Sequence, residues 1–395
     1  MDFKKAFDSV SHNGLLLKLK SIGITGKLWS WLQTYLKYRS QCVRIRTSTS
    51  EYCDVLSGVP QGSVLGPLLF VIFINDLPHS IHSAIPYIFA DDTKCLHSIK
   101  SPNDVVKLQD DIDSISSWSH TCNLLFNESK FIHLHFWQKT TNIPTYTVNS
   151  KSINTLSQHK DLGVNFSNNL HWTKHYDTII TKAYQTLGLV RRTFKLNSIE
   201  ARKQLYISLV RSQLLYCSPL WRPQLLKDIF TLEQVQRRAT KFILNDYESS
   251  YKTRLEKLHL LPLMYVYELN DLMFLVKSLK APTAYFNIYQ YVHFVSNATR
   301  SGTSSKLVHS KPTSSVHQHF YFNRIVRLWN YMPTIDLSLS TNLIKRQLKT
   351  FLWNKFISKF NTDLLCSYHM ICPCHRCSSQ PISVNFGDLT NTLIL

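Results

Sequence analysis

Two adjacent acids between two apolar segments constrain this chain more than any other feature. Apolar residues 87–90 lead into Asp91 and Asp92, and a second strand-like segment covers residues 93–99. This pattern predicts a β-hairpin with carboxylates at its tip. Adjacent carboxylates repel each other unless a cation offsets their charge, and divalent ions with oxygen ligands do this well. A solvated turn is the alternative for an Asp-Asp pair taken alone.

The surroundings of this hairpin are typical of an α+β fold. Ser101, Pro102 and Asp104 have the residue types of a helix N-cap and first turn. An apolar stripe at helical spacing follows, formed by Val105, Leu108, Ile112 and Ile115. We therefore expect this helix to cover one face of a sheet. Alternating residues 131–136 predict a further strand.

The pattern becomes helical after about residue 173. Apolar side chains at helical spacing mark one long helix through Ile229, Leu232, Ala239 and Phe242. We accordingly divide the chain into an α+β segment, 1–172, a helical segment, 173–280, and a mainly helical C-terminal region, 281–395, with a Cys/His-rich tail. Nothing in the pattern indicates an oligomeric state.

The charge favours a polyanionic partner. The formal net charge is +20, from 45 Lys and Arg against 25 Asp and Glu. Such a surplus suits nucleic acid better than an acidic small molecule, although a basic soluble protein without that partner is the alternative. The longest apolar run, residues 64–74, contains Gly66 and Pro67 and is shorter than the roughly 20 residues that cross a bilayer, so we expect no membrane span.

The nine cysteines fall into two groups. Five are scattered singly and four lie near the C-terminus, without a secretory signal before them. This distribution predicts reduced thiols inside the cell, with nothing that separates nucleus from cytoplasm. The C-terminal group has enough ligands for one tetrahedral zinc ion and consists of Cys366, Cys372, Cys374, His375 and Cys377. Its spacing matches neither a zinc knuckle nor a two-pair ribbon, so an unliganded tail is the alternative.

Two further segments accompany the acidic hairpin. Residues 1–8 read Met-Asp-Phe-Lys-Lys-Ala-Phe-Asp, with Asp2 directly before a Phe. Residues 57–67 read Ser-Gly-Val-Pro-Gln-Gly-Ser-Val-Leu-Gly-Pro, a glycine-punctuated loop that opens an apolar helix with Pro67 near its first turn. In this order, the acid, the loop and the Ala-Asp-Asp hairpin resemble motifs A, B and C of the reverse transcriptase palm. Their conjunction is much more specific than any one of them.

The resemblance continues along the chain. Residues 127–130, Asn-Glu-Ser-Lys, are similar to motif D. Leu162, Gly163 and Val164 resemble the strand that grips the primer end. Residues 232–240, and later Phe-Asn-Arg at 322–324 with Leu-Trp-Asn at 328–330, are similar to the thumb and C-terminal regions of LINE-type polymerases. The resemblance covers residues 1–352 and implies a polymerase palm, an antiparallel sheet backed by helices, followed by a helical thumb and a C-terminal mainly helical region.

The resemblance also implies a metal site. Asp2 and Asp91 would hold two Mg²⁺ ions, and Asp92 would complete the acidic cluster. One ion would lower the pKa of the primer 3′-hydroxyl, and the other would stabilise the leaving pyrophosphate.

Four further residues receive roles by resemblance. Phe7 would be the sugar gate that favours dNTPs, and a core Phe is the alternative. Gln61 and Gly62 would lie beside the nucleotide and template, the alternative being a turn that needs glycine for its backbone angles alone. Lys130 would protonate or neutralise the pyrophosphate, with an ordinary surface lysine as the alternative.

An aromatic helix runs into a basic strand after the first motif. Trp29, Trp31 and Tyr35 precede Arg39 and Arg44. Such a combination can stack on and contact a single-stranded template. We assign most of the aromatic side chains to the core and the two arginines to nucleic-acid binding.

Two classes of function follow. The first is an RNA-directed DNA polymerase that extends a DNA primer on an RNA template with dNTPs and Mg²⁺. The second is a truncated, catalytically inactive remnant that only binds nucleic acid. Because Asp2 follows Met1 directly, we expect the fingers subdomain to be missing, the copy to be truncated at its N-terminus, and Asp2 to sit on a frayed and poorly positioned terminus.

Overall fold

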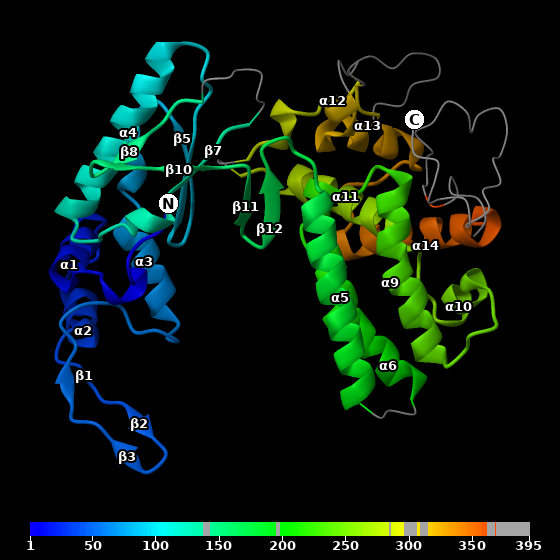
Figure 1. Ribbon diagram of the computed structural model, residues 1–395, viewed down its shortest axis with the longest axis horizontal. Helices are drawn as coiled ribbons and strands as arrows, with labels where there is room; N and C mark the ends of the chain where they lie inside the picture. The colour runs from blue at the N-terminus through cyan, green and yellow to red at the C-terminus, as the bar shows by residue number, and fades with distance from the viewer. Residues whose placement is uncertain are drawn as a thin grey trace. The chain divides into compact units, whose positions relative to one another are not determined.

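The described strands of the computed structural model all end by Ser167, and helices predominate after that residue (Figure 1). The structure describes residues 1–136, 143–194, 198–283, 286–295, 306–308, 315–361 and 368. The chain divides into unit 1, Met1–His159 with Ser167–Leu170, and unit 2, Lys160–Phe166 with His171–Leu395. The predicted α+β class is confirmed at this level.

Unit 1 combines helices with two-stranded sheets. Its helices are α1 (His12–Ser21), α2 (Gly26–Leu36), α3 (Leu65–Ile74) and α4 (Pro102–Thr121), with 3₁₀ turns η1 (Ala6–Asp8), η2 (Leu77–Ser80) and η3 (Glu128–Lys130). The antiparallel pairs are β1 (Ser40–Gln41) with β4 (Cys53–Asp54), β2 (Arg44–Ile45) with β3 (Ser48–Thr49), β5 (Ile85–Phe89) with β6 (Asp92–Leu96), and β8 (Thr147–Val148) with β9 (Lys151–Ser152). Strand β7 (Ile132–Leu134) pairs in parallel with β10 (Asn154–Leu156). Strands β11 (Gln158–Asp161) and β12 (Val164–Ser167) also pair with each other, and most of their residues belong to unit 2.

The predicted acidic hairpin is confirmed. Strands β5 and β6 pair in a register that sets Phe89 opposite Asp92, so Ala90 and Asp91 form the turn. Ala90 adopts a φ of 51°, in the left-handed region that tight hairpin turns use.

The first residues of the chain lie alongside this hairpin. The Met1 nitrogen donates to the Thr93 carbonyl oxygen at 2.9 Å, and the Thr93 nitrogen donates to the Met1 carbonyl oxygen at 3.3 Å. On the other side, Phe3 forms an antiparallel bridge with Phe126. The expected fraying of this segment is therefore wrong, because backbone hydrogen bonds hold it on both sides.

The antiparallel sheet expected here is found as separate pairs, and β7 pairs in parallel. The segments around Phe3 and Phe126 meet in an isolated bridge, and a 3₁₀ turn begins soon after each of them: η1 at Ala6 and η3 at Glu128. The strand predicted over residues 131–136 is shorter, covering Ile132–Leu134.

Helix α4 has the predicted start and the predicted inner face. The Asp104 carboxylate accepts from the Ser101 nitrogen at 2.9 Å, and Pro102 is the first helical residue. The apolar stripe packs in the same core as Ile88 of β5 and Cys95 of β6, and its members are Val105, Leu108, Ile112 and Ile115. The helix therefore covers the hairpin, as predicted.

Unit 2 is mainly helical. Its described helices are α5 (Thr173–Thr193), α6 (Ile199–Leu205), the π-helix η4 (Tyr206–Arg211), α7 (Ser212–Leu215), α8 (Ser218–Trp221), α9 (Leu226–Leu244), α10 (Tyr251–Lys257), α11 (Leu263–Lys280), η5 (Ile288–Gln290), α12 (Ser315–His319), α13 (Tyr321–Tyr331) and α14 (Thr341–Lys359). One apolar core joins Leu232 of α9, Leu272 of α11, Trp329 of α13 and Leu352 of α14. Helices from 173–280 and from the C-terminal region therefore share a core.

A buried charge cluster ties three parts of unit 2 together. Asp271 of α11 is fully buried and pairs at 3.0 Å with Arg222, which follows α8, and at 3.0 Å with Arg324 of α13. None of the helices in the described ranges is long and apolar enough to cross a membrane.

Candidate active site

Asp2 is fixed by its backbone and contacts one cation. Its carbonyl oxygen accepts from the Asn127 nitrogen at 2.8 Å, and its Oδ2 accepts from the Lys130 Nζ at 2.6 Å. The hydrogen bond and the charge of Asp2 raise the pKa of Lys130, and the charges of Asp91 and Asp92 raise it further. The ammonium of Lys130 therefore lies in the field of all three acids.

The three acids come from two chain segments joined by β pairing. Asp91 lies in the hairpin turn and Asp92 begins β6, and both side chains are half-buried. The hydrogen bonds between Met1 and Thr93 bring Asp2 beside that turn. The structure thus assembles Asp2, Asp91 and Asp92 with Lys130 in one place.

The three carboxylates are the type of ligand that a hard divalent cation prefers, because they supply oxygen atoms and already attract an ammonium. Among the described residues, however, no group of three or more His, Cys, Asp or Glu side chains is arranged to hold a metal ion. Lys130 contacts the Oδ2 of Asp2 directly, so its ammonium competes with a metal ion for this carboxylate.

The glycine-punctuated loop packs against the segment that follows Asp2. The Val59 nitrogen donates to the Phe7 carbonyl oxygen at 2.8 Å, and the Gln61 Nε2 donates to the Asp8 Oδ1 at 2.7 Å. The half-buried ring of Phe7 stacks on Phe70 of α3 with centroids 4.7 Å apart. The predicted residues Phe7 and Gln61 therefore lie near each other, held in part by Asp8, a residue that sequence reasoning missed although it closes the first motif.

Two glycines of this loop have different surroundings. A Cβ at Gly58, whose φ is 89°, would lie 2.7 Å from the Asp8 Cα and 2.9 Å from the Phe7 carbonyl oxygen. At Gly62 the φ is 76° and no atom lies within 4 Å of the Cβ position. Gly62 is thus required for its backbone angles, whereas Gly58, which sequence reasoning did not single out, is required for a close backbone approach.

Arg39 and Arg44 differ in their partners. The Arg39 Nε donates to the Leu36 carbonyl oxygen at 3.0 Å, and another Arg39 nitrogen donates to the Gly58 carbonyl oxygen at 3.0 Å. Arg39 therefore connects the end of α2 to the glycine-punctuated loop by hydrogen bonds. Arg44 is exposed on β2, in an arm of four short strands that extends from the end of α2 (Figure 1).

The predicted primer-grip residues form a strained hairpin turn in unit 2. Leu162 and Gly163 join β11 to β12 with φ values of 43° and 85°. The Tyr216 hydroxyl donates to the Leu162 carbonyl oxygen at 2.9 Å, and Val164 is buried in the core of unit 2. A non-glycine residue at positive φ is uncommon, and the hydrogen bond from Tyr216 helps to hold the backbone of Leu162 in this conformation. The predicted zinc ligands, Cys366, Cys372, Cys374, His375 and Cys377, lie outside the described residues.

The family model for "Reverse transcriptase (RNA-dependent DNA polymerase)" matches residues 1–166. This stretch contains Asp2, the glycine-punctuated loop, the acidic hairpin and Lys130. Residues 1–166 of the chain therefore belong to the reverse transcriptase family. The predicted family is therefore confirmed, and the loop and hairpin of this reverse transcriptase are the segments expected to carry motifs B and C.

Curated relatives come from retrotransposable elements. The chain is 30% identical over 256 residues to a probable RNA-directed DNA polymerase from transposon BS of Drosophila melanogaster, covering 62% of this chain and 28% of the relative. It is 30% identical over 196 residues to the RNA-directed DNA polymerase from mobile element jockey of the same organism, covering 47% and 21%. It is 27% identical over 156 residues to the Pol polyprotein from type-1 retrotransposable element R2 of Popillia japonica, covering 39% and 25%. These matches confirm the LINE type, and the chain spans about a quarter of these relatives' length.

Proposed function

We propose that this chain is the polymerase part of a retrotransposon-derived reverse transcriptase that extends a DNA primer on an RNA template with dNTPs. One observation carries the proposal: Asp2 and the Asp91–Asp92 turn act on the same Lys130 ammonium. Acids that are far apart in the chain thus influence one ammonium, and a site for nucleotidyl transfer with metal ions would draw on these same carboxylates.

Asp2 and Asp91 would hold two Mg²⁺ ions, with Asp92 completing the cluster. When bound, the ions lower the pKa of the primer 3′-hydroxyl and stabilise the departing pyrophosphate. Lys130 would leave Asp2 and neutralise or protonate the pyrophosphate, since a lysine ammonium is positively charged at neutral pH.

Phe7, Gln61 and Gly62 would position the nucleotide. Phe70 supports the Phe7 ring, which gives the sugar a firm face against which a 2′-hydroxyl would clash. The contact with Asp8 orients the Gln61 amide, and the open space at Gly62 leaves room for a nucleotide or template base. Leu162 and Gly163 would contact the primer end, with the buried Val164 holding their hairpin in place.

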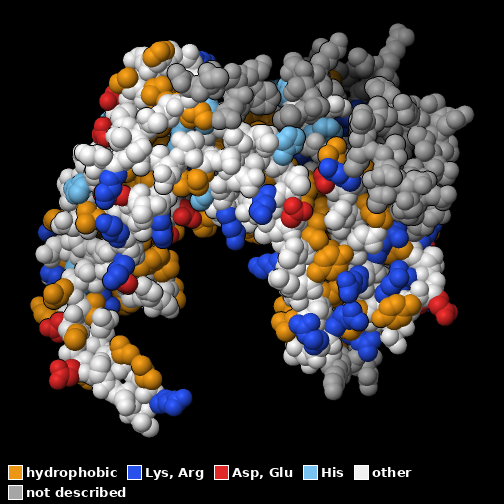
Figure 2. Space-filling model, in the orientation of Figure 1, with side chains coloured by type: hydrophobic (Ala, Val, Ile, Leu, Met, Phe, Trp, Pro, Cys, Tyr) orange, Lys and Arg blue, Asp and Glu red, His pale blue; other side chains and the backbone are white. Residues whose placement is uncertain are grey.

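Basic helices of unit 2 support binding of the RNA template and DNA primer. Figure 2 shows Lys and Arg side chains gathered over the lower parts of α5, α6 and α9 on the viewed face. Arg191 and Arg192 at the end of α5, and Arg238 of α9, are exposed. Exposed cations along parallel helices suit a phosphate backbone. We place this activity inside the cell, in keeping with the five free thiols among the described residues.

A remnant that only binds nucleic acid is the second candidate. The contact of Lys130 with Asp2 at 2.6 Å favours it, because that contact occupies the first metal ligand. The basic surface of unit 2 would serve this function equally well.

Primer extension by the purified chain on an RNA template separates the two candidates. Wild type is compared with Asp91→Ala and with a matched control, Asp110→Ala, an exposed acid on α4. A polymerase extends the primer in wild type and in the control but not in Asp91→Ala. If none of the three proteins extends the primer but all still bind the primer–template, the chain is a remnant that only binds nucleic acid.

A further inference from the structure

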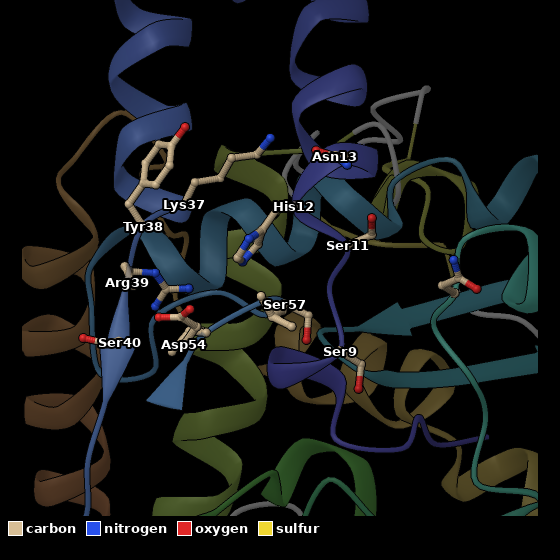
Figure 3. A pocket seen from close by; sticks show the side chains of 13 residues that line it. Ser9, Ser11, His12, Asn13, Lys37, Tyr38, Arg39, Ser40, Asp54 and Ser57 are labelled. Atoms are coloured by element: carbon tan, nitrogen blue, oxygen red, sulfur yellow. The ribbon is translucent and has the colours of Figure 1, made fainter. Parts of the chain in front are cut away.

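A pocket of about 940 Å³ lies in unit 1, outside the acidic cluster (Figure 3). The start of α1 and the segment after α2 line it together with the chain before the glycine-punctuated loop. The lining residues that matter here are Ser11, His12, Asn13, Lys37, Tyr38 and Arg39. We call it the Tyr38 pocket.

The Tyr38 pocket carries positive charge. Two cations, Lys37 and Arg39, line it together with one acid, Asp54. The ten-residue helix α1 begins here, and its dipole favours an anion, with the Ser11 side chain accepting from the Gly14 nitrogen at the cap. Burial, followed by the charges of Arg39 and Lys37, lowers the pKa of His12, so its ring is neutral at neutral pH.

Tyr38 has a conformation that the fold does not explain. Its φ is 59°, in the left-handed region, and its side chain is 93% exposed. An aromatic residue rarely adopts such a φ, and local strain of this kind clusters at binding sites. Because the exposed ring contributes nothing to the core, its backbone strain is not offset by packing. Figure 3 shows Tyr38 next to Lys37 at the pocket, with Arg39 and His12 nearby.

We propose that the Tyr38 pocket binds a phosphodiester group of a single-stranded nucleic acid, with Lys37 facing the phosphate and a neighbouring base stacked on Tyr38. Bases of any sequence stack on an aromatic ring, so we expect this site to bind single strands without sequence preference. The inference rests on the proposed function, since it supplies a holding point for a template strand.

Binding of fluorescein-labelled oligouridylate and oligothymidylate to the full chain tests the proposal, without Mg²⁺ or dNTPs. Tyr38→Asn removes the ring and suits the left-handed backbone, so we expect affinity to fall about 5- to 150-fold while the melting temperature stays equal or rises. Tyr38→Phe keeps the ring and should bind within about twofold of wild type.

Lys37→Gln should make the slope of log K against log salt shallower by about 0.7, as loss of one phosphate contact requires. The matched controls are Tyr247→Asn, whose ring is 59% exposed in unit 2, and Lys27→Gln, on α2. Both should bind as wild type does.

Wild-type affinity in Tyr38→Asn, or an equal loss in Tyr247→Asn, would overturn the site. A loss restricted to the RNA or the DNA probe supports it and identifies the strand. Because the assay contains no dNTPs, a chain that fails in primer extension can still pass this test.

Discussion

Gly58 and Gly62 lie in one loop, but a side chain added at Gly58 would clash with neighbouring backbone, whereas one added at Gly62 would enter open space. A Cβ at Gly58 meets backbone atoms of Phe7 and Asp8, which cannot rotate away. At Gly62 only the positive φ resists a side chain.

Gly58→Ala should lower the free energy of unfolding by about 2–4 kcal/mol, because it adds overpacking to left-handed strain. Gly62→Ala should cost about 1–2 kcal/mol, from the strain alone. Urea denaturation followed by tryptophan fluorescence measures both. Equal losses would contradict the difference in packing.

Lys130 is the second residue with a testable role, since it contacts Asp2 and feels the charges of both hairpin acids. Lys130→Met removes this competing cation, so we expect Mn²⁺, a spectroscopic substitute for Mg²⁺, to bind up to about fivefold more tightly. Electron paramagnetic resonance of free Mn²⁺ gives the affinity directly.

The control for this experiment is Lys151→Met. Lys151 is an exposed lysine that pairs with Glu128, one turn from Lys130. It should leave Mn²⁺ affinity unchanged. If both variants behave alike, the effect is one of overall charge and Lys130 does not occupy the metal site.

Helix α9 contains a buried acid at the centre of unit 2. Glu233 accepts from the Leu263 nitrogen at 2.9 Å and from the Tyr251 hydroxyl. Burial raises the pKa of Glu233 to about 7, although these hydrogen bonds oppose the shift. This helix therefore carries a charge that folding disfavours at high pH.

The sign of the pH dependence follows from that shift. The folded pKa of about 7 exceeds the ordinary 4.5, so the stability contributed by protonated Glu233 is complete below 4.5 and is lost as pH rises through about 7. Buried His175 acts oppositely, because its pKa falls to about 4 and its contribution is lost as pH falls below 6.5. The pH dependence of wild type alone therefore mixes the two effects, and the test must compare the stability of wild type with that of a Glu233 variant at each pH.

Glu233→Gln should remove the part of the loss of stability that Glu233 causes as the pH rises through about 7. The stability of wild type relative to Glu233→Gln is expected to decrease between about pH 5 and pH 8, measured by urea unfolding at each pH. Glu248→Gln, an exposed acid after α9, is the control and should leave the profile unchanged. A difference that is constant with pH would refute the raised pKa.

At the scale of the molecule, the two units have separate hydrophobic cores with no residue in common. We expect two calorimetric transitions in the full chain, because each core is built from its own set of residues. Gly58→Ala should lower the melting temperature of one transition only. A single transition that shifts as a whole would mean that the units unfold together.

Much of this protein was determined by local signals in its sequence. The acidic hairpin, the cap and inner stripe of α4, and the family are confirmed, because turn residues, capping residues and hydrophobic period act over a few positions. The sequence did not predict that the strands would form separate two-stranded sheets in place of one larger sheet, because strand pairing depends on contacts between distant segments.

Tertiary structure alone decided how distant residues meet. The sequence indicated Asp2 and Lys130 as separate motif residues, and only the fold shows that they form an ion pair across 128 positions. The crowding at Gly58 and the placement of Tyr38 beside Lys37 at a pocket likewise arise where separate segments converge. Side-chain partners are selected by three-dimensional proximity, and a one-dimensional pattern specifies the residue types available but not which of them come into contact.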